Sequence, residues 1–171
     1  HVLKQNYSNF EIVFVDNNST DGSKEMIQEK YGKNLKYVFN LNNLGFPGGM
    51  NSGIKASNGD YILLLNSDLF LEESYISNAV MEFDSNSNTH IGMLAGMVYK
   101  YENGSCSNKI DALGLKLLPY HAVVDISNRN SSQFVFAPSG ASMFLKREML
   151  EETKLNNGDY LDSTYFAYGE D

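Results

Sequence analysis

Short apolar runs alternate with helical patterns along the first half of the chain. Residues 12–15 (IVFV) and 61–65 (YILLL) are unbroken apolar runs, which are typical of strands buried on both faces of a sheet. A third short strand is expected at residues 35–39. Because apolar residues at helical spacing lie between these strands, the pattern predicts an α/β fold with a mostly parallel sheet.

The predicted helices follow turn-forming residues. Thr20 and Asp21 are good N-cap candidates for a helix that continues through Tyr31. A second helix is expected to have Pro47 in its first turn, and a third to span about residues 73–84.

The second half of the chain has a less regular pattern. Strands are expected at residues 91–101, 134–137 and 141–145, with a hairpin turn at Asn103–Gly104. Irregular and partly β structure is expected at 105–130, and a helix is expected to start at 147–152. The second half should therefore be mixed rather than parallel.

Two of the predicted strands lead into acidic residues. Asp16 is the first residue after the run at 12–15, and Asp68 follows Asn66 and Ser67 after the run at 61–65. Open α/β sheets bind ligands at the carboxyl ends of their strands, so both carboxylates are expected along one edge. Asp68 suits a hard divalent cation, although a single carboxylate needs a diphosphate to complete the site. The alternative is that each acid only caps the turn after its strand.

Residues 43–53 are rich in glycine, with glycines at 45, 48, 49 and 53. Backbone without Cβ can approach a ligand closely, and N–H groups at a helix start favour anions. The segment lacks both GxxxxGK[ST] and GxGxxG, however. Taken alone, it favours the alternative of a tight structural turn.

The C-terminal residues Glu170 and Asp171 follow an aromatic stretch. Such a pair is usually solvated, but the aromatic residues make partial burial plausible, and a carboxylate held there could act as a general base on a hydroxyl.

Composition narrows the functional classes. The chain of 171 residues with 42% hydrophobic residues predicts one domain, and its formal net charge of -8 argues against a nucleic-acid partner. A single cysteine, Cys106, excludes an internal disulfide and a cysteine-based zinc site. The longest apolar runs are about five residues, far below the roughly 20 that span a bilayer. No metal-ligand spacing links the three histidines, His1, His90 and His121.

Five stretches, taken in order, resemble a family of known enzymes. They are VDNNSTDGS at 15–23, NLGFPGGMNSGI at 43–54, LLLNSD at 63–68, GASMFLKRE at 140–148 and FAYGED at 166–171. The set resembles the family 2 glycosyltransferases of the GT-A fold. The sequence of the second stretch is most similar to that of rhamnosyltransferase-like members, which assemble bacterial polysaccharides. The resemblance implies a three-layer α/β sandwich, with the nucleotide-binding part at about residues 1–100 and the acceptor side at about 101–171.

The resemblance also implies roles for residues of the first half. Asp16 would hydrogen-bond the nucleobase of a UDP- or dTDP-sugar, with Asn18 nearby. Asn43 and Asn51 would line the nucleotide and diphosphate side of the site.

Further roles are implied for the metal site and the acceptor side. Asn66-Ser67-Asp68 occupies the place of the family's DxD motif, in which Asp68 matches the acid that binds Mg²⁺ or Mn²⁺. Gly140 and Ala141 would border the sugar and acceptor pocket. Asp171 would be the catalytic base of an inverting transfer, with Glu170 as the second candidate.

The resemblance has consequences for the whole protein. The acceptor would be a saccharide or a lipid-linked saccharide, and the protein would be cytoplasmic or peripheral at the inner face of the membrane. The family's first strand and its helices beyond the ED pair are missing, so the chain is expected to be a fragment. Three alternatives remain: a catalytically inactive sugar-nucleotide-binding module, a nucleotidyltransferase on a related scaffold, and an acidic pocket that is merely structural.

Overall fold

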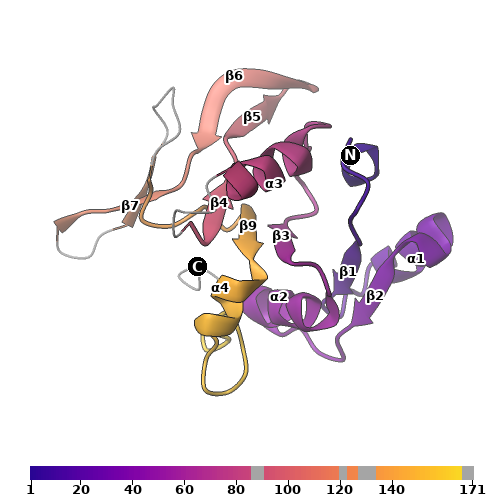
Figure 1. Cartoon of the computed structure of the whole chain (residues 1–171). Coiled ribbons are helices and arrows are strands. Elements are labelled where there is room, and N and C mark those ends of the chain that lie inside the picture. Colours follow the sequence, from indigo (N-terminus) through magenta and orange to yellow (C-terminus); the bar gives the residue numbers. More distant parts are fainter. Residues whose placement is uncertain (86–90, 120–122, 127–133, 167–171) are drawn as a thin grey trace. The chain divides into compact units, whose positions relative to one another are not determined.

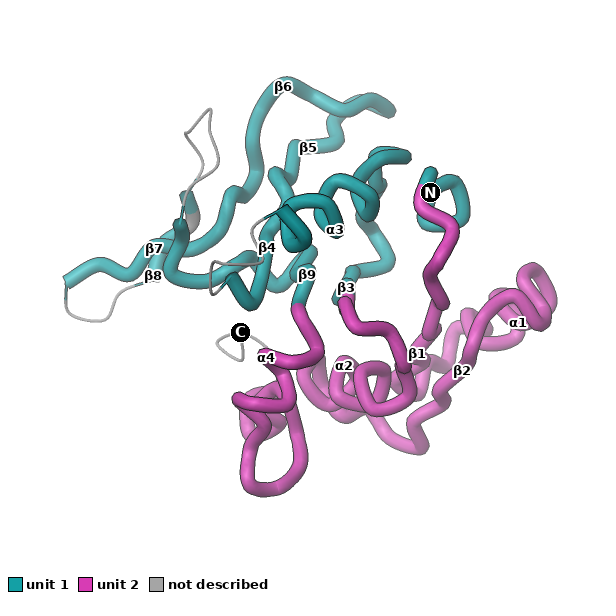
Figure 2. Tube along the Cα trace, in the orientation of Figure 1, with its two compact units in different colours: residues 1–6, 63–145, 171 teal, residues 7–62, 146–170 magenta. Residues whose placement is uncertain are grey.

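The computed structural model describes residues 1–85, 91–119, 123–126 and 134–166. The chain divides into two compact units, coloured separately in Figure 2. Of the described residues, those within 1–6 and 63–145 form unit 1, and those within 7–62 and 146–166 form unit 2. Each unit is described by itself, and the single domain expected over residues 1–171 stays a prediction.

Unit 2 contains a β-α-β arrangement (Figure 1). Strands β1 (Val13–Asp16) and β2 (Lys36–Phe39) pair in parallel, with Val13 opposite Lys36. Helix α1 (Ser23–Tyr31) and the 3-10 helix η2 (Gly32–Asn34) connect them, as a parallel pair requires. Helix α2 (Gly45–Ala56) follows β2, and helix α4 (Arg147–Glu152) starts where the sequence predicts a helix start.

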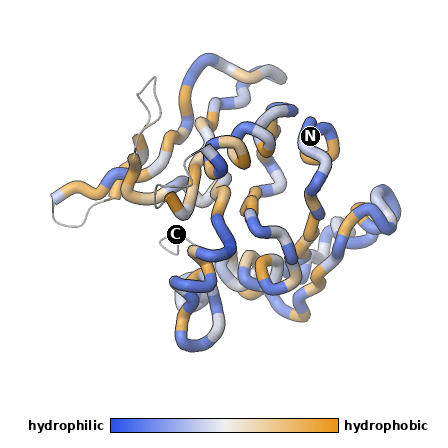
Figure 3. The backbone as a smooth tube through the Cα atoms, viewed as in Figure 1, coloured by the Kyte–Doolittle hydropathy of each residue, from blue (hydrophilic) through white to orange (hydrophobic). Residues whose placement is uncertain are grey.

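The start of α1 differs from the prediction. Its N-cap is Gly22, in the left-handed conformation, and not Thr20 or Asp21. The carboxylate of Asp21 instead accepts the N–H of Ser23 at 3.0 Å, which forms a local turn just before the helix. Figure 3 shows α1 as mostly hydrophilic, and none of its residues is buried.

Helix α2 packs closely on β1 through two glycines. A Cβ on Gly53 would lie 3.0 Å from Cγ2 of Val15, and one on Gly49 would lie 3.4 Å from Nδ2 of Asn17. The two glycines are four residues apart and so share one helix face. They let the helix approach the strand, and Ile54 of the same helix is almost fully buried.

Burial along β1 is the reverse of the prediction. Residues 13–15 are only half-buried, whereas Asp16 is buried, with 5% of its surface exposed. Since β1 pairs with β2 alone in its described sheet, and α2 packs against the carboxyl end of β1, burial is concentrated at that end. Asp16 is therefore not the first residue outside the core.

Unit 1 is built around a three-stranded sheet. The strand order is β3 (Tyr61–Leu65), β9 (Ser142–Lys146), β4 (Met93–Ala95), and the unit boundaries fall within β3 and β9. Strand β4 runs antiparallel to β9. Helix α3 (Tyr75–Ser85) buries Phe83, which stacks on Phe144 of β9 with ring centroids 5.7 Å apart.

The rest of unit 1 consists of a short N-terminal 3-10 helix, η1 (Val2–Lys4), and two strand pairs. Strands β5 (Val98–Glu102) and β6 (Ser105–Ala112) form an antiparallel hairpin. Its Asn103 and Gly104 both have positive φ, as the predicted Asn-Gly turn requires. Strands β7 (Leu115–Leu117) and β8 (Val123–Asp125) also pair antiparallel.

Two strand predictions in this part of the chain were wrong. The stretch at 91–101 is divided into β4 and β5, which belong to different sheets. Residues 134–137 form no strand; Ala137 makes one isolated bridge to Leu115. Residues 105–117 are more regular than expected, because most of them pair in β6 and β7.

Candidate functional site

The carboxylate of Asp16 lies at the end of β1, where the sequence predicts a ligand. Of the residues that the structure describes, only Ser19 hydrogen-bonds this side chain, through its N–H at 3.2 Å. A carboxylate has about four acceptor positions, and a buried one needs partners for them. Asp16 therefore combines 5% exposure with unused capacity to accept hydrogen bonds.

Asn17, the next residue, is the centre of an amide network that sequence reasoning missed. Its Nδ2 donates to Oδ1 of Asn43 at 3.0 Å and to the carbonyl of Gly45 at 2.9 Å. Its Oδ1 accepts from Nδ2 of Asn40 and from the N–H of Leu44, both at 3.1 Å. Both donors and both acceptor positions of this amide are thus used within the protein. The network fixes the start of α2 on the end of β1.

The N–H groups at the start of α2 are all accounted for. A helix leaves its first four N–H groups without helical partners, here at residues 44–47. That of Leu44 donates to Asn17, that of Gly45 donates to Oδ1 of Asn43 at 3.0 Å, and that of Phe46 donates to the carbonyl of Phe166 at 2.9 Å. Pro47 has no N–H. The described N–H groups of this glycine-rich helix start therefore have partners within the protein, which favours the alternative of a structural turn.

The other asparagines predicted for the nucleotide side have different surroundings. Asn18 is exposed and has a φ of 67°, and Asn43 is exposed with its Oδ1 already bonded twice. Asn51 is buried: its Oδ1 accepts the N–H groups of Tyr160 and Leu161 at 2.9 and 3.0 Å, and its Nδ2 donates to the carbonyl of Leu161 at 2.8 Å. These bonds explain the burial of Asn51 without a ligand, and its role at the diphosphate stays a prediction.

In unit 1, the structure brings together two of the predicted site segments. The backbone N–H of Asn66 donates to the carbonyl of Ala141 at 3.3 Å, so the turn after β3 lies beside residues 140–141. Ser67 and Asp68 are exposed in this turn, while Gly140 and Ala141 are half-buried. The metal-binding and acceptor-side predictions therefore fall on adjacent segments.

The donor set at residues 66–68 fits a hard cation chemically, because it offers carboxylate, amide and hydroxyl oxygens. It supplies only one carboxylate, however. Among the described residues, no group of three or more His, Cys, Asp or Glu side chains could hold a metal ion. A cation at Asp68 would need further ligands from a bound diphosphate.

Several predicted features lie outside the described residues. These are Glu170 and Asp171, the two candidate bases, and the histidines His90 and His121. Asp16 and Asp68 belong to different units, so their common sheet edge also stays a prediction.

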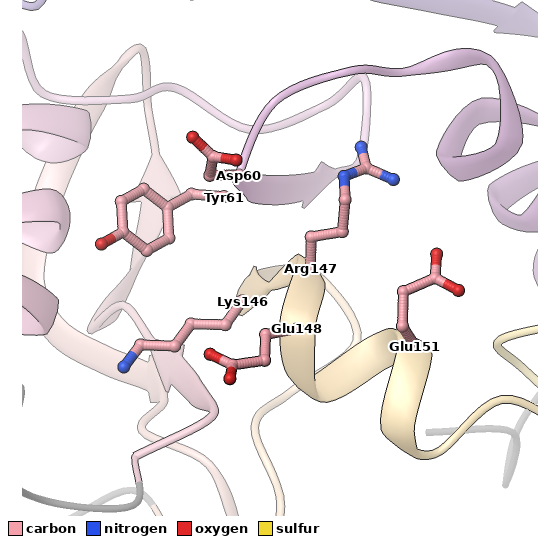
Figure 4. A pocket seen from close by; sticks show the side chains of 6 residues that line it. All are labelled: Asp60, Tyr61, Lys146, Arg147, Glu148 and Glu151. Carbon is pink, nitrogen blue, oxygen red and sulfur yellow. The ribbon is translucent and has the colours of Figure 1, made fainter.

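A hollow elsewhere in unit 2 contains none of the predicted site residues. It has a volume of about 420 Å³ and is lined by Asp60, Tyr61, Lys146, Arg147, Glu148 and Glu151 (Figure 4). The guanidinium of Arg147 donates to the carbonyl of Gly59 at 2.7 Å and to Oγ of Ser57 at 2.8 Å. Hydrogen bonds from Tyr160 and Lys154 hold the pKa of Glu151 below its usual value. These two charged groups are thus engaged within the protein.

The fold and the family of the chain are shown by comparison with known proteins. A crystal structure of Staphylococcus aureus TarS (residues 1–349) in complex with UDP superposes with a TM-score of 0.65, covering 98% of this chain and 46% of that one at 22% identity. The chain thus has the GT-A fold. The family model for glycosyl transferase family 2 matches residues 1–152, and the chain belongs to that family.

Two curated relatives have informative names. Glycosyltransferase GlyG of Streptococcus pneumoniae is 26% identical over 95% of this chain and 55% of its own length. The Escherichia coli enzyme WfaP, a UDP-Glc:α-D-GlcNAc-diphosphoundecaprenol β-1,3-glucosyltransferase, is 31% identical over 69% of this chain and 55% of its own length. The chain spans about half the length of these relatives. In the part of the chain that the structure describes, no helix is long and apolar enough to cross a membrane.

Proposed function

We propose that the protein transfers a sugar, with inversion, from a UDP- or dTDP-sugar to an acceptor hydroxyl in the assembly of a cell-surface polysaccharide. The observation that carries the proposal is the buried carboxylate of Asp16, which has one described hydrogen-bond donor. It lies at the carboxyl end of a parallel strand, where α/β sheets bind ligands.

A pyrimidine nucleobase suits this carboxylate. In a uridine or thymidine nucleotide the base keeps one ring N–H, at N3, which can donate to a carboxylate oxygen. Hydrogen bonds to charged groups are worth about 1.5–3 kcal/mol, so this contact would favour a base with a suitably placed N–H. The presence of UDP in the TarS structure and of UDP-Glc in the name of WfaP supports a uridine donor. Asn18, exposed beside Asp16, would complete the base site.

The diphosphate would be bound in part through Asp68. A divalent cation, Mg²⁺ or Mn²⁺, neutralises charge on a departing nucleoside diphosphate when it is bound there. Asp68 would hold it together with the donor's phosphate oxygens, and its exposure leaves the carboxylate accessible. Asn66 and Ser67 would border the phosphates, and Gly140 and Ala141, adjacent to this turn, would border the sugar and the acceptor.

The reaction needs a base for the acceptor hydroxyl. Asp171 would accept the hydroxyl proton as the acceptor oxygen attacks the anomeric carbon, and the bond from that carbon to the diphosphate oxygen would break. Attack opposite the leaving group inverts the anomeric centre. Glu170 is the second candidate for this role.

The acceptor is proposed to be a saccharide, free or lipid-linked, as the diphosphoundecaprenol in the name of WfaP suggests. We place the protein in the cytoplasm or at the inner face of the membrane, where it would have access to the nucleotide-sugar donor and to the acceptor. A rhamnosyltransferase-like specificity remains part of the proposal.

Calorimetric titration of the intact protein with UDP, dTDP and GDP, with and without Mn²⁺, tests the function. Binding of UDP or dTDP that strengthens with Mn²⁺ is expected. Absence of binding by all three nucleotides would contradict the proposal and favour a structural acidic pocket. Binding without consumption of any UDP- or dTDP-sugar would favour an inactive binding module.

A further inference from the structure

We propose that the start of α2 is a positioning junction, in which Asn17 and Gly45 set the location of the backbone at Phe166. The proposal rests on the function proposed above. Asn17 and Gly45 would affect the rate of sugar transfer without contacting the donor.

The first part of the junction is a hydrogen bond between distant segments of unit 2. The N–H of Phe46, in the first turn of α2, donates to the carbonyl of Phe166 at 2.9 Å. A peptide carbonyl thus occupies the position in which a helix start would bind an anion. This carbonyl belongs to the FAYGED stretch, whose last residue, Asp171, is the fifth after Phe166.

Gly45 allows this close approach. A Cβ at this position would overlap the carbonyl oxygen of Phe166 and would lie 2.9 Å from its ring atom Cδ2. Gly45 also has a φ of +71°, a conformation that L-residues rarely adopt. Any side chain here would therefore displace the backbone at Phe166 or shift the start of the helix.

Asn17 fixes the other side of the junction. Its amide bonds the carbonyl of Gly45 and the N–H of Leu44, which holds the helix start on the end of β1. Asn17 directly follows Asp16, the proposed nucleobase anchor. The strand end that would bind the donor and the segment that leads to the proposed base are thus connected through one short set of hydrogen bonds.

This connection matters because transfer depends on the geometry of the base. A displacement of about 1 Å can cost on the order of 100-fold in rate even when binding persists. A positioning residue should therefore lower kcat while leaving the donor KM and nucleotide affinity nearly unchanged. A donor ligand should instead weaken nucleotide binding.

The test compares Gly45→Ala with a matched control, Gly104→Ala. Gly104 has a similar φ of +80°, but no atom lies within 4 Å of its would-be Cβ. Both variants therefore carry the same backbone strain, and only Gly45→Ala adds the clash. Three readouts are needed: hydrogen exchange of the Phe46 N–H, calorimetric affinity for UDP with Mn²⁺, and the kcat and KM for UDP-glucose or dTDP-rhamnose consumption.

For Gly45→Ala, we expect loss of the slow exchange at the Phe46 N–H, a UDP affinity within about threefold of wild type, and a kcat lowered about 10- to 100-fold. Gly104→Ala should change none of these. If Gly45→Ala does not fold, Asn17→Ala provides the second variant, with faster exchange at the Leu44 N–H and the same fall in kcat.

Three results would overturn the inference. The first is unchanged exchange at the Phe46 N–H in Gly45→Ala, because the junction would then not depend on Gly45. The second is lost exchange protection with an unchanged kcat, and the third is a UDP affinity that falls as much as kcat. If the wild type neither binds nor consumes a nucleotide sugar, the proposed function fails, while the exchange measurement still decides whether the junction exists.

Discussion

Two polar regions of the chain differ in how their side chains and N–H groups are hydrogen-bonded. At the start of α2, the side chains of Asn17 and Asn43 and the N–H groups of residues 44–46 bond to other parts of the protein. In the turn after β3, Ser67 and Asp68 are exposed to solvent. Both regions follow a strand, and both belong to stretches that resemble the family.

The difference separates polar side chains that serve the fold from those that are accessible to a ligand. A polar side chain whose donors and acceptors are all bonded internally supports the structure. A carboxylate that is exposed, like Asp68, or buried with few partners, like Asp16, can still accept a ligand. The hydrogen bonds that a polar side chain makes within the protein therefore distinguish a structural residue from one that can bind a ligand.

The largest expected effect on turnover is that of a substitution at the proposed catalytic base, which belongs to neither region. Asp171→Asn should lower turnover about 10²- to 10⁴-fold, the range of general-base catalysis, while nucleotide binding persists. Steady-state rates and calorimetry on the same samples measure both. Glu170→Gln is the control, and equal effects of the two substitutions would contradict the assignment of Asp171.

Asp68→Asn tests the accessible turn. Loss of the carboxylate should remove most of the Mn²⁺ dependence of nucleotide binding and lower turnover about 100-fold. Because Asp68 is exposed, the free energy of unfolding should change by less than about 0.5 kcal/mol. A large loss of stability in denaturant unfolding would make the turn a structural element and remove the contrast between the two regions.

Asn17→Ala tests the supporting network. The substitution removes four hydrogen bonds, so we expect a loss of about 2–3 kcal/mol in the free energy of unfolding, measured with denaturant. Asn66→Ala in the accessible turn is the comparison and should cost less than about 0.5 kcal/mol. Equal costs would show that the two regions do not differ in this way.

A smaller effect concerns a structural polar pair in unit 1. The hydroxyls of Tyr75 and Ser142 lie 2.8 Å apart, and burial raises the pKa of the Tyr75 hydroxyl above its usual value near 10. The unfolded chain therefore ionises first, so this stabilisation is present below about pH 10 and is lost as pH rises through the pKa of the folded state. Tyr75→Phe should remove this part of the alkaline destabilisation, as seen in unfolding curves between about pH 8 and 11.

Local patterns predicted many of the elements. The bounds of β3 and the start of α4 agree with the prediction, and the Asn103–Gly104 turn forms because both residues accept positive φ. Features that depend on distant contacts were not predictable. The burial of Asp16 depends on how α2 packs against β1, and the pairing of β4 and β5 in different sheets depends on β9 and β6.

The candidate site shows the same division. The motifs selected Asp16 and Asp68 from the sequence. Asn17 was missed because its role depends on partners more than 20 residues away in the chain, which a local pattern does not reveal. One signal was present in the sequence, because Asn17 lies between Asp16 and Asn18, which were both predicted site residues. The sequence alone does not distinguish an asparagine that is fully hydrogen-bonded within the fold from one that faces a ligand.

Calorimetric titration of Asp16→Asn with UDP and Mn²⁺, beside wild type, decides whether the buried carboxylate of Asp16 binds a nucleobase. We expect a 10- to 100-fold lower affinity for the variant, because a hydrogen bond to a charged acceptor is worth about 1.5–3 kcal/mol. An Asp16→Asn variant that folds and binds UDP as tightly as wild type would contradict it.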